Sequence, residues 1–271
     1  MVEPLYDRIY RRLERARWHL AEIPFDRVDV SAVSDETLEF VRVNCLLELS
    51  SLYATRMFLR DFRDNTDFCQ FMSIWYFEEM RHYLVLREYL NTFGRAPDPD
   101  AFPTLDTELK PAPWPNTLAM HWCGELRLGQ WYFRWAGVFR EPVLSSIFRS
   151  IGEDEFRHAQ CYEEFIDRAL ERRPELLSQF VNTAKWMLFN PGGDKHPTTY
   201  GDASVDGIAV SDRIDGYALL LEKLRETVPD SDEERLQARV LSTVSRWSGR
   251  PIQTRSDLVR FSRTLAPAES H

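Results

Sequence analysis

The sequence predicts an all-α protein built on a four-helix bundle. Four long segments place large apolar residues at spacings of three and four, which is the period of a helix that buries one face. The motif Glu-x-x-His occurs twice, at residues 79–82 and 155–158, with an arginine before the histidine in both copies. A lone glutamate, Glu48 or Glu125, precedes these copies by 31 and 30 residues. This duplication indicates two similar helix pairs, and no segment shows a convincing strand pattern.

The length and charge of the chain bound its organisation and its partners. The 271 residues allow one large domain or two small ones. We expect a single domain over residues 1–271, with a four-helix core at about 34–172 and a C-terminal helical extension at about 173–271. The net charge of −9 argues against a general nucleic-acid binder, which would present a basic face.

The sequence favours neither membrane insertion nor disulfide bonding. No stretch approaches the ~20 apolar residues that a membrane-spanning helix requires. Met1 is followed by acidic residues and an amphipathic segment, so no signal peptide is expected. The four cysteines form no Cys-x-x-Cys pair, which argues against a zinc ribbon. We therefore expect a cytoplasmic protein with reduced, buried cysteines.

The N-terminal part of the chain predicts two helices. Residues 4–21 are expected to form the first, which ends before Pro24. Ser34 caps the next helix, and Asp35 and Glu36 in its first turn favour the positive end of the helix dipole. The expected buried row of this helix contains one carboxylate among small and apolar residues: Val41, Cys45, Glu48, Leu52 and Thr55.

Asn65 is predicted to cap the second helix of the bundle, and Gly94 to follow its last turn. Its buried row combines large apolar residues with the first Glu-x-x-His motif: Phe68, Met72, Trp75, Glu79, His82, Leu86 and Tyr89. Residues 96–115 contain six prolines and are therefore not helical. A long connection between the second and third helices is typical of one class of four-helix bundle.

The third and fourth helices repeat the same arrangement. Asn116 is predicted to cap the third, whose buried row is Leu118, Glu125, Leu128, Tyr132 and Trp135. A break at residues 137–142 separates it from the fourth helix, which Pro142 begins. The buried row of the fourth helix contains the second motif: Leu144, Phe148, Ile151, Glu155, His158, Tyr162 and Phe165.

The C-terminal region is less strongly patterned. Pro174 is expected to separate the fourth helix from a shorter one at 175–189. Residues 190–216 are loop-like, and two further helices are expected near 212–227 and 232–247. The last ~20 residues show only a weak pattern.

The repeated motif points to a two-metal centre. Positions i and i+3 lie on one face of a helix, so each Glu-x-x-His pair is able to chelate one ion. Glu48 and Glu125 on neighbouring helices would complete a site of four carboxylates and two imidazoles. Imidazole suits iron better than it suits magnesium or calcium, so the donor set favours iron or manganese.

Solvated surface acids are the alternative explanation for these residues. A single Glu-x-x-His motif would favour that alternative, since glutamate is common on exposed helix faces. Here each candidate stands in a row of large apolar residues, as Glu79 does between Trp75 and Leu86. Four carboxylates facing one core repel one another unless cations lie between them. The pattern therefore favours the metal centre.

At these motifs the chain resembles a known family. Residues 75–82 read Trp-Tyr-Phe-Glu-Glu-Met-Arg-His, and residues 154–158 read Asp-Glu-Phe-Arg-His. They resemble the Glu-Glu-x-Arg-His and Asp-Glu-x-Arg-His segments of the soluble acyl-carrier-protein desaturases, which are ferritin-like di-iron carboxylate proteins. Residues 89–95 also resemble the end of that family's helix. The resemblance covers about 35–175 well and 175–247 only by helix position, and it implies a ferritin-like bundle.

The resemblance implies a role for each matching residue. It implies six metal ligands: Glu48, Glu79, His82, Glu125, Glu155 and His158. Asp154 would accept a hydrogen bond from a ligand histidine, and Arg81 and Arg157 would pair with carboxylates around the site. A plain surface location is the alternative for the two arginines. Two iron ions per chain are the implied cofactor, with manganese as the other option.

Leu128 departs from the family pattern. The family carries a threonine, implicated in oxygen activation, one turn after the glutamate that matches Glu125. Leu128 stands at that position around the site, and an aliphatic side chain relays no proton. The departure favours a related oxidation over desaturation in its usual form.

The family implies an O2-dependent oxidase that inserts a double bond into a carrier-bound acyl chain. A ferredoxin-type donor would supply two electrons per turnover, and a homodimer is the implied assembly. Two alternatives stay open: a di-iron oxygenase that hydroxylates or N-oxygenates a small metabolite, and a ferritin-like protein that handles iron or peroxide. Leu128 and the net negative charge favour the oxygenase, whereas the long C-terminal region argues against iron storage.

Overall fold

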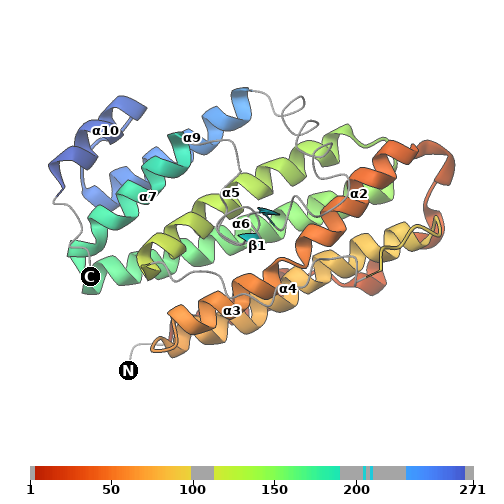
Figure 1. The fold of residues 1–271 in the computed structure, drawn as a ribbon, viewed down its shortest axis with the longest axis horizontal. Coiled ribbons are helices and arrows are strands. Elements are labelled where there is room, and N and C mark those ends of the chain that lie inside the picture. Colours follow the sequence, from red (N-terminus) through yellow and green to blue (C-terminus); the bar gives the residue numbers. More distant parts are fainter. Residues whose placement is uncertain (1–3, 99–112, 190–203, 206–207, 210–229, 266–271) are drawn as a thin grey trace.

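A computed structural model describes residues 4–98, 113–189, 204–205, 208–209 and 230–265. Its centre is a bundle of four rods (Figure 1), the first of which consists of two consecutive helices, α2 (Asp35–Glu48) and α3 (Ser51–Asp61). The other rods are α4 (Thr66–Asn91), α5 (Trp114–Val138) and α6 (Pro142–Arg172). α2 and α3 pack on α4, and α5 packs closely on α6. The predicted four-helix bundle is confirmed.

Further helices surround the bundle. At the N-terminus, α1 (Leu5–Ala16) packs against α4 and α6. At the C-terminus, α7 (Leu177–Phe189) and α9 (Asp230–Ser248) pack against α5, and α10 (Arg255–Thr264) packs against α7. Four short 3-10 turns, at Leu20–Glu22, Phe25–Arg27, Val30–Ala32 and Pro174–Leu176, join these elements. None of the helices in the described ranges is both long and apolar enough to cross a bilayer.

The helix caps follow local chemistry. Ser34 accepts a hydrogen bond from the Thr37 backbone amide, and Asn65 accepts one from the Phe68 amide. These side chains satisfy amides at the helix N-termini that have no partner inside the helix. Gly94 adopts a φ of +64°, a left-handed conformation that favours glycine, and the chain leaves α4 there. The predicted caps at Ser34, Asn65 and Gly94 are confirmed.

Two predicted helix boundaries are wrong, and one helix was not expected. α5 begins at Trp114 rather than after Asn116, because Pro115 in the first turn lacks only an amide hydrogen that would be unpaired anyway. α1 ends at Ala16 rather than at residue 21, and Arg17 is extended. The weakly patterned C-terminus contains α10, which begins at a reciprocal cap between Thr254 and Asp257.

The predicted first rod is not one continuous helix. α2 ends at Glu48, and Leu49 and Ser50 form a tight turn in which their amides bond to carbonyls three residues earlier. The buried row therefore does not continue through Leu52 and Thr55, which are only half-buried. In α3 the buried residues are Ser51, Tyr53, Ala54, Met57 and Phe58.

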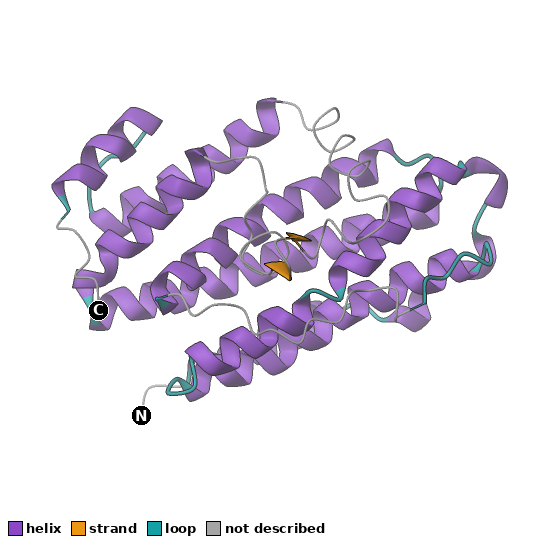
Figure 2. Cartoon of the chain, viewed as in Figure 1, coloured by secondary structure: helices purple, strands orange, loops and turns teal. Residues whose placement is uncertain are grey.

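Two short strands are the remaining difference from the expected fold. β1 (Ser204–Val205) pairs antiparallel with β2 (Ile208–Ala209), and the ladder is too short to leave a periodic signal in the sequence. Figure 2 shows them as the only strands drawn against a helical background. Most of the proline-rich connection at 96–115 and the predicted helix at 212–227 lie outside the described residues.

Candidate metal centre

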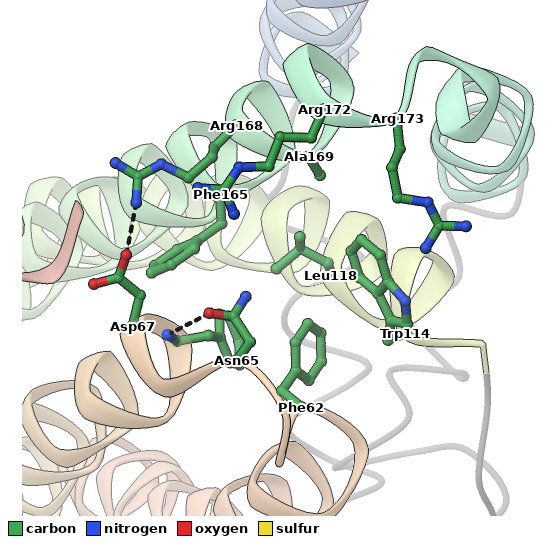
Figure 3. Close-up of a pocket in the computed structure, with 11 residues that line it drawn as sticks. Phe62, Asn65, Asp67, Trp114, Leu118, Phe165, Arg168, Ala169, Arg172 and Arg173 are labelled. Carbon is green, nitrogen blue, oxygen red and sulfur yellow. Dashed lines mark hydrogen bonds and ion pairs between the residues drawn. The ribbon is translucent and has the colours of Figure 1, made fainter. Parts of the chain in front are cut away.

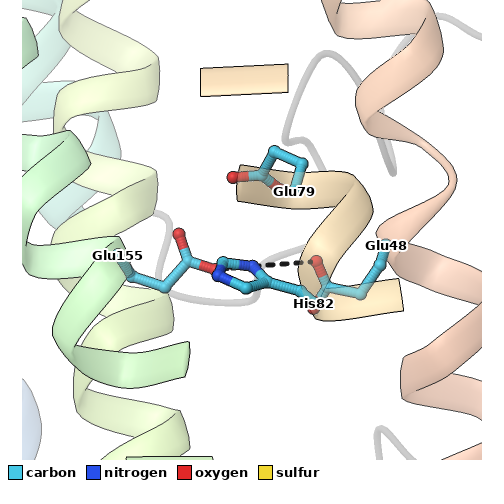
Figure 4. Close-up of side chains that lie close together, drawn as sticks. All are labelled: Glu48, Glu79, His82 and Glu155. Atoms are coloured by element: carbon cyan, nitrogen blue, oxygen red, sulfur yellow. Dashed lines mark ion pairs between the residues drawn. The ribbon is translucent and has the colours of Figure 1, made fainter. Parts of the chain in front are cut away.

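The structure brings all six predicted ligands together inside the bundle. Glu48 ends α2, Glu79 and His82 lie on α4, Glu125 on α5, and Glu155 and His158 on α6. All six are buried, and neither histidine is exposed at all. Figure 4 shows how α2, α4 and α6 contribute Glu48, Glu79, His82 and Glu155. Residues more than a hundred positions apart thus meet at one level of the bundle.

These six residues form two overlapping groups. Glu48, Glu79, His82 and Glu155 make the first, and their candidate ligand atoms all lie within 4.8 Å of one another. The second group meets the same criterion and consists of Glu79, Glu125, Glu155 and His158. Glu79 and Glu155 belong to both groups, so each is placed to bridge two ions, while Glu48 and Glu125 each serve one.

Both imidazoles turn the same atom toward the centre. The Nδ1 atom of His82 lies 3.5 Å from Glu48 Oε2 and 3.6 Å from Glu155 Oε1. The Nδ1 atom of His158 lies 3.2 Å from Glu79 Oε1 and 3.4 Å from Glu155 Oε2. The two rings are 6.1 Å apart between centroids. This arrangement leaves both Nε2 atoms facing away from the centre.

The outward nitrogens meet carboxylates from the opposite motif. His82 Nε2 lies 3.2 Å from Asp154 Oδ2, and His158 Nε2 lies 3.0 Å from Glu78 Oε2. An acceptor at this position fixes the tautomer with Nδ1 free to bind a metal. The structure therefore brings Asp154 to the histidine as the resemblance implied. Glu78 was not among the predicted site residues, although it precedes Glu79 just as Asp154 precedes Glu155.

The two arginines of the motifs surround Asp154. Arg81 lies 2.8 Å from Asp154 Oδ2 and 3.6 Å from Glu78 Oε1, and Arg157 bonds to Asp154 Oδ1. Burial raises the pKa of Asp154, but the contacts with His82 and both arginines outweigh it and hold the pKa well below its usual value. Asp154 therefore stays ionised and keeps accepting hydrogen bonds.

Trp18 extends this network toward the surface. Its indole N–H donates to Asp154 Oδ2 at 2.6 Å, and the Arg81 guanidinium lies 4.4 Å from the centre of the indole ring. Trp18 is half-buried and follows the extended Arg17 at the end of α1. A continuous series of hydrogen bonds therefore joins Trp18 through Asp154 to His82.

Aromatic side chains donate hydrogen bonds to the unshared glutamates, Glu48 and Glu125, which each belong to only one of the two groups. The sequence did not single out these two donors for this role. The Trp75 indole donates to Glu125 Oε1 at 3.1 Å, and the Tyr132 hydroxyl donates to Glu48 Oε1. Leu128, one turn before Tyr132, is half-buried and packs against the core. The hydroxyl nearest to this part of the centre on α5 thus belongs to Tyr132.

The pKa values of the two shared glutamates and of both histidines are raised when no cation is bound. Burial, together with the charge of Glu125, raises the pKa of Glu79 to about 7. Burial and the charges of Glu125 and Glu79 raise the pKa of Glu155 well above its usual value. Burial lowers the pKa of His82, but the contacts with Asp154 and Glu48 outweigh it and raise the pKa to about 9. Bound cations would take the place of protons on these groups.

The donor set fits a pair of metal ions. Four inward atoms are buried without a hydrogen-bond partner among the described residues: His82 Nδ1, His158 Nδ1, Glu79 Oε1 and Glu155 Oε2. Buried polar atoms without partners are costly, so their convergence from α4 and α6 calls for a ligand. Mixed carboxylate and imidazole donors suit iron or manganese.

Comparison with solved structures identifies the architecture. No family model and no curated protein sequence matches the chain. A Mycobacterium tuberculosis structure described as the acyl-ACP desaturase DesA2 superposes with a TM-score of 0.55 at 18% identity, covering 95% of this chain and 96% of that one. The chain has the ferritin-like fold.

A second ferritin-like structure supports the same conclusion. It is a mutant of an R2-like ligand-binding oxidase with an anaerobically reconstituted Mn/Fe cofactor. Its TM-score is 0.50 at 16% identity, over 93% of this chain and 95% of that one. At sequence identities of 18% and 16%, the two structural similarities establish the fold.

A separate cleft of about 170 Å³ lies where α4 begins and α6 ends (Figure 3). Its apolar wall is made of Phe62, Phe68, Trp114, Leu118 and Phe165. Arg172 on its rim is 14 residues from His158, or about 21 Å along a helix. The other rim arginines are paired, Arg168 with Asp67 at 2.6 Å and Arg173 with Glu175 at 3.0 Å. Phe165, the lining residue of α6 nearest to His158, is 7 residues from it, or about 10 Å along a helix, so the cleft lies beyond the candidate ligands toward this end of the bundle.

Proposed function

We propose that this protein is an O2-dependent di-iron oxidase whose substrate is an acyl chain, and that its reaction is desaturation of a carrier-bound acyl group. The observation that carries the proposal is the pair of four-residue groups that share Glu79 and Glu155. A shared pair of carboxylates holds two ions close together, which is the arrangement that activates O2 in carboxylate-bridged centres. Manganese in one or both positions is the alternative metal content.

The six ligands divide into bridging and terminal roles. Glu79 and Glu155 would bridge the ions, Glu48 and His82 would bind one, and Glu125 and His158 the other. Bound iron would supply O2 activation and the oxidising power that removes hydrogen from an unactivated C–H bond. Asp154 and Glu78 would keep a proton on each Nε2 atom, so that both Nδ1 atoms remain ligands.

The closed interior serves the chemistry by excluding water. All six ligands are buried, and Trp75 and Tyr132, which donate hydrogen bonds to two of them, belong to the hydrophobic core. Such a site protects a reactive oxidised centre from side reactions with solvent. The likeness to a structure described as an acyl-ACP desaturase supports an acyl substrate, which would lie along this apolar interior.

We propose that electrons enter from outside the molecule. Desaturation of a CH2–CH2 unit with O2 yields two waters only when two electrons and two protons are supplied. The series from Trp18 through Asp154 to His82 is the hydrogen-bonded connection that joins the half-buried edge of α1 to the centre. A ferredoxin-type donor in the cytoplasm is the proposed partner, and a homodimeric assembly and a single domain over residues 1–271 complete the proposal.

An oxygenase acting on a small metabolite is the second candidate function, and Leu128 is the observation that favours it. This position follows Glu125 by one turn and carries no hydroxyl. Hydroxylation or N-oxygenation retains an oxygen atom in the product, whereas desaturation removes two hydrogens. The two candidates therefore differ in the mass of the product.

A single-turnover reaction separates these candidates. The protein is loaded with ferrous iron without oxygen, mixed with acyl carrier protein that bears a long saturated chain, and exposed to O2. Loss of two hydrogens, measured by mass spectrometry of the acyl chain, supports the desaturase. Gain of one oxygen atom identifies a hydroxylase. An unchanged chain with O2 consumed rejects this substrate, and a failure to bind iron rejects the proposed function.

A further inference from the structure

The two unshared glutamates are each held by an aromatic side chain from another rod. Tyr132 on α5 donates its hydroxyl hydrogen to Glu48 at the end of α2. Trp75 on α4 donates its indole hydrogen to Glu125 on α5 at 3.1 Å. In both cases the accepting atom is Oε1, and both donors are buried.

The second oxygen of each glutamate faces the centre. Glu48 Oε2 lies 3.5 Å from His82 Nδ1, and Glu125 Oε2 lies 4.0 Å from His158 Nδ1. A carboxylate is able to bind a metal through one oxygen or through both. The hydrogen bond from the aromatic donor occupies one lone pair of Oε1 and reduces its negative charge, so Oε2 is the better donor atom for the ion. The hydrogen bond therefore favours one-oxygen binding.

Glu48 depends on its donor more than Glu125 does. Glu125 stands inside α5, whereas Glu48 is the last residue of α2 and precedes the tight turn at Leu49 and Ser50. Its backbone thus lacks a continuing helix on one side. The Tyr132 ring is held in place by the core, with the Phe148 ring 5.4 Å away between centroids. Tyr132 is therefore the rigid partner of the pair.

We propose that Tyr132 is a positioning residue that keeps Glu48 a one-oxygen ligand and so preserves a free coordination position on the ion bound by His82. This inference rests on the proposed function, because it requires two bound metal ions. Tyr132 lies one turn beyond Leu128 on the same face of α5, so α5 places a hydroxyl at the centre although residue 128 has none. Trp75 plays the corresponding part for Glu125.

The test is Tyr132→Phe, which removes the hydroxyl and leaves the ring. Tyr162→Phe is the matched control, because Tyr162 is wholly buried and its hydroxyl has no hydrogen-bond partner among the described residues. Both proteins are loaded with ferrous iron without oxygen. Near-infrared magnetic circular dichroism then distinguishes five-coordinate from six-coordinate ions, and dialysis gives the iron content.

The expected result is a change in coordination without loss of iron. Tyr132→Phe still binds two ions, but Glu48 Oε1 is free to join Oε2, so the signal of a five-coordinate ion is lost. The rate of reaction with O2 should fall roughly 10-fold, the effect typical of removing an outer partner of a metal ligand. Tyr162→Phe keeps the spectrum and the rate of the unaltered protein.

Two results overturn the inference in distinguishable ways. If the unaltered protein binds two ions and Tyr132→Phe gives the same spectrum, Tyr132 does not set the binding of Glu48 and the proposed function stands. If the unaltered protein binds no iron pair, the proposed function and this inference both fail. Should Tyr132→Phe not fold, the spectrum of the unaltered iron-loaded protein still decides, because two six-coordinate ions there would overturn the inference.

Discussion

The Glu78 carboxylate lies 3.0 Å from the Nε2 atom of His158, so α4 orients the histidine that α6 contributes to the centre. The reverse contact, from Asp154 on α6 to His82 on α4, is 3.2 Å long. Each motif thus provides a histidine for the proposed metal centre and a carboxylate for the other motif's histidine. The two helices depend on each other for a functional site.

Replacing Glu78 should weaken metal binding at one position. Glu78→Ala leaves His158 without its acceptor, and we expect the affinity for one of two ferrous ions to fall roughly 10–100-fold. Asp64→Ala is the control, since the Asp64 side chain is 96% exposed. Anaerobic titration measures both affinities. If Glu78→Ala binds both ions with the affinities of the unaltered protein, Glu78 does not support His158.

The metal-free protein should lose stability as the pH rises from about 5 to 9. Folding raises the pKa of Glu79 to about 7 and the pKa of His82 to about 9. The folded state therefore binds protons at these two groups more tightly than the unfolded state does. Stability from such groups is complete below their unfolded pKa values and disappears as pH passes the folded ones. The pKa of Asp154 is lowered, so the stability that this carboxylate contributes is lost as the pH falls, and only at more acidic pH.

Thermal unfolding at several pH values checks this dependence. The unfolding temperature of the metal-free protein should decrease steadily across the interval, and loading with iron should reduce the slope, because bound cations replace the protons. A metal-free protein whose unfolding temperature rises between pH 6 and 9 would contradict the assigned protonation.

Changing Trp18 should slow electron delivery without altering the chemistry of the reduced enzyme. Trp18→Phe removes the indole N–H that donates to Asp154. With chemically reduced iron, a single turnover should proceed at the normal rate. Steady-state turnover with a protein electron donor should slow roughly 10-fold. Trp131→Phe is the control, because Trp131 on α5 is half-buried as Trp18 is. Equal steady-state rates in the two variants would remove Trp18 from the electron path.

The contact between α5 and α6 requires glycine at position 152. A Cβ there would lie 2.8 Å from the Phe133 ring and 3.1 Å from the Gly129 carbonyl oxygen. Gly152→Ala should therefore destabilise the protein by about 1–3 kcal/mol, as overpacking does. Gly137→Ala, with no atom within 4 Å, should stabilise α5 by about 0.5–1 kcal/mol. Urea unfolding measures the change in stability of both variants, and equal changes would contradict the close packing at Gly152.

The long apolar rows explain why most of the bundle was predictable. In α4 and α6 every residue of the expected row is buried, because the rows combine strict helical spacing with large side chains. The turn after Glu48 was not predictable: no proline or glycine marks it, and apolar residues continue on both sides. α10 was missed because only Leu258, Phe261 and Ser262 of its residues are buried.

The candidate site was predictable to a similar extent. The two Glu-x-x-His motifs indicated four of the six proposed ligands, since residues three apart on a helix share a face. The lone glutamates upstream indicated the other two, Glu48 and Glu125. The partners of Glu48 and Glu125 depend on how α4 and α5 rotate against their neighbours, so Tyr132 and Trp75 appeared only as core residues. Glu78 carried a signal in the duplicated sequence, because it occupies the position that Asp154 holds in the second motif.

Iron stoichiometry tests the two-metal centre most directly. Anaerobic titration with ferrous iron should saturate at two ions per chain. Glu79→Ala, which removes a carboxylate shared by both groups, should weaken both ions, whereas Glu48→Ala should weaken only one. Saturation at one ion or none in the unaltered protein, or equal effects of the two substitutions, would contradict a centre bridged by Glu79 and Glu155.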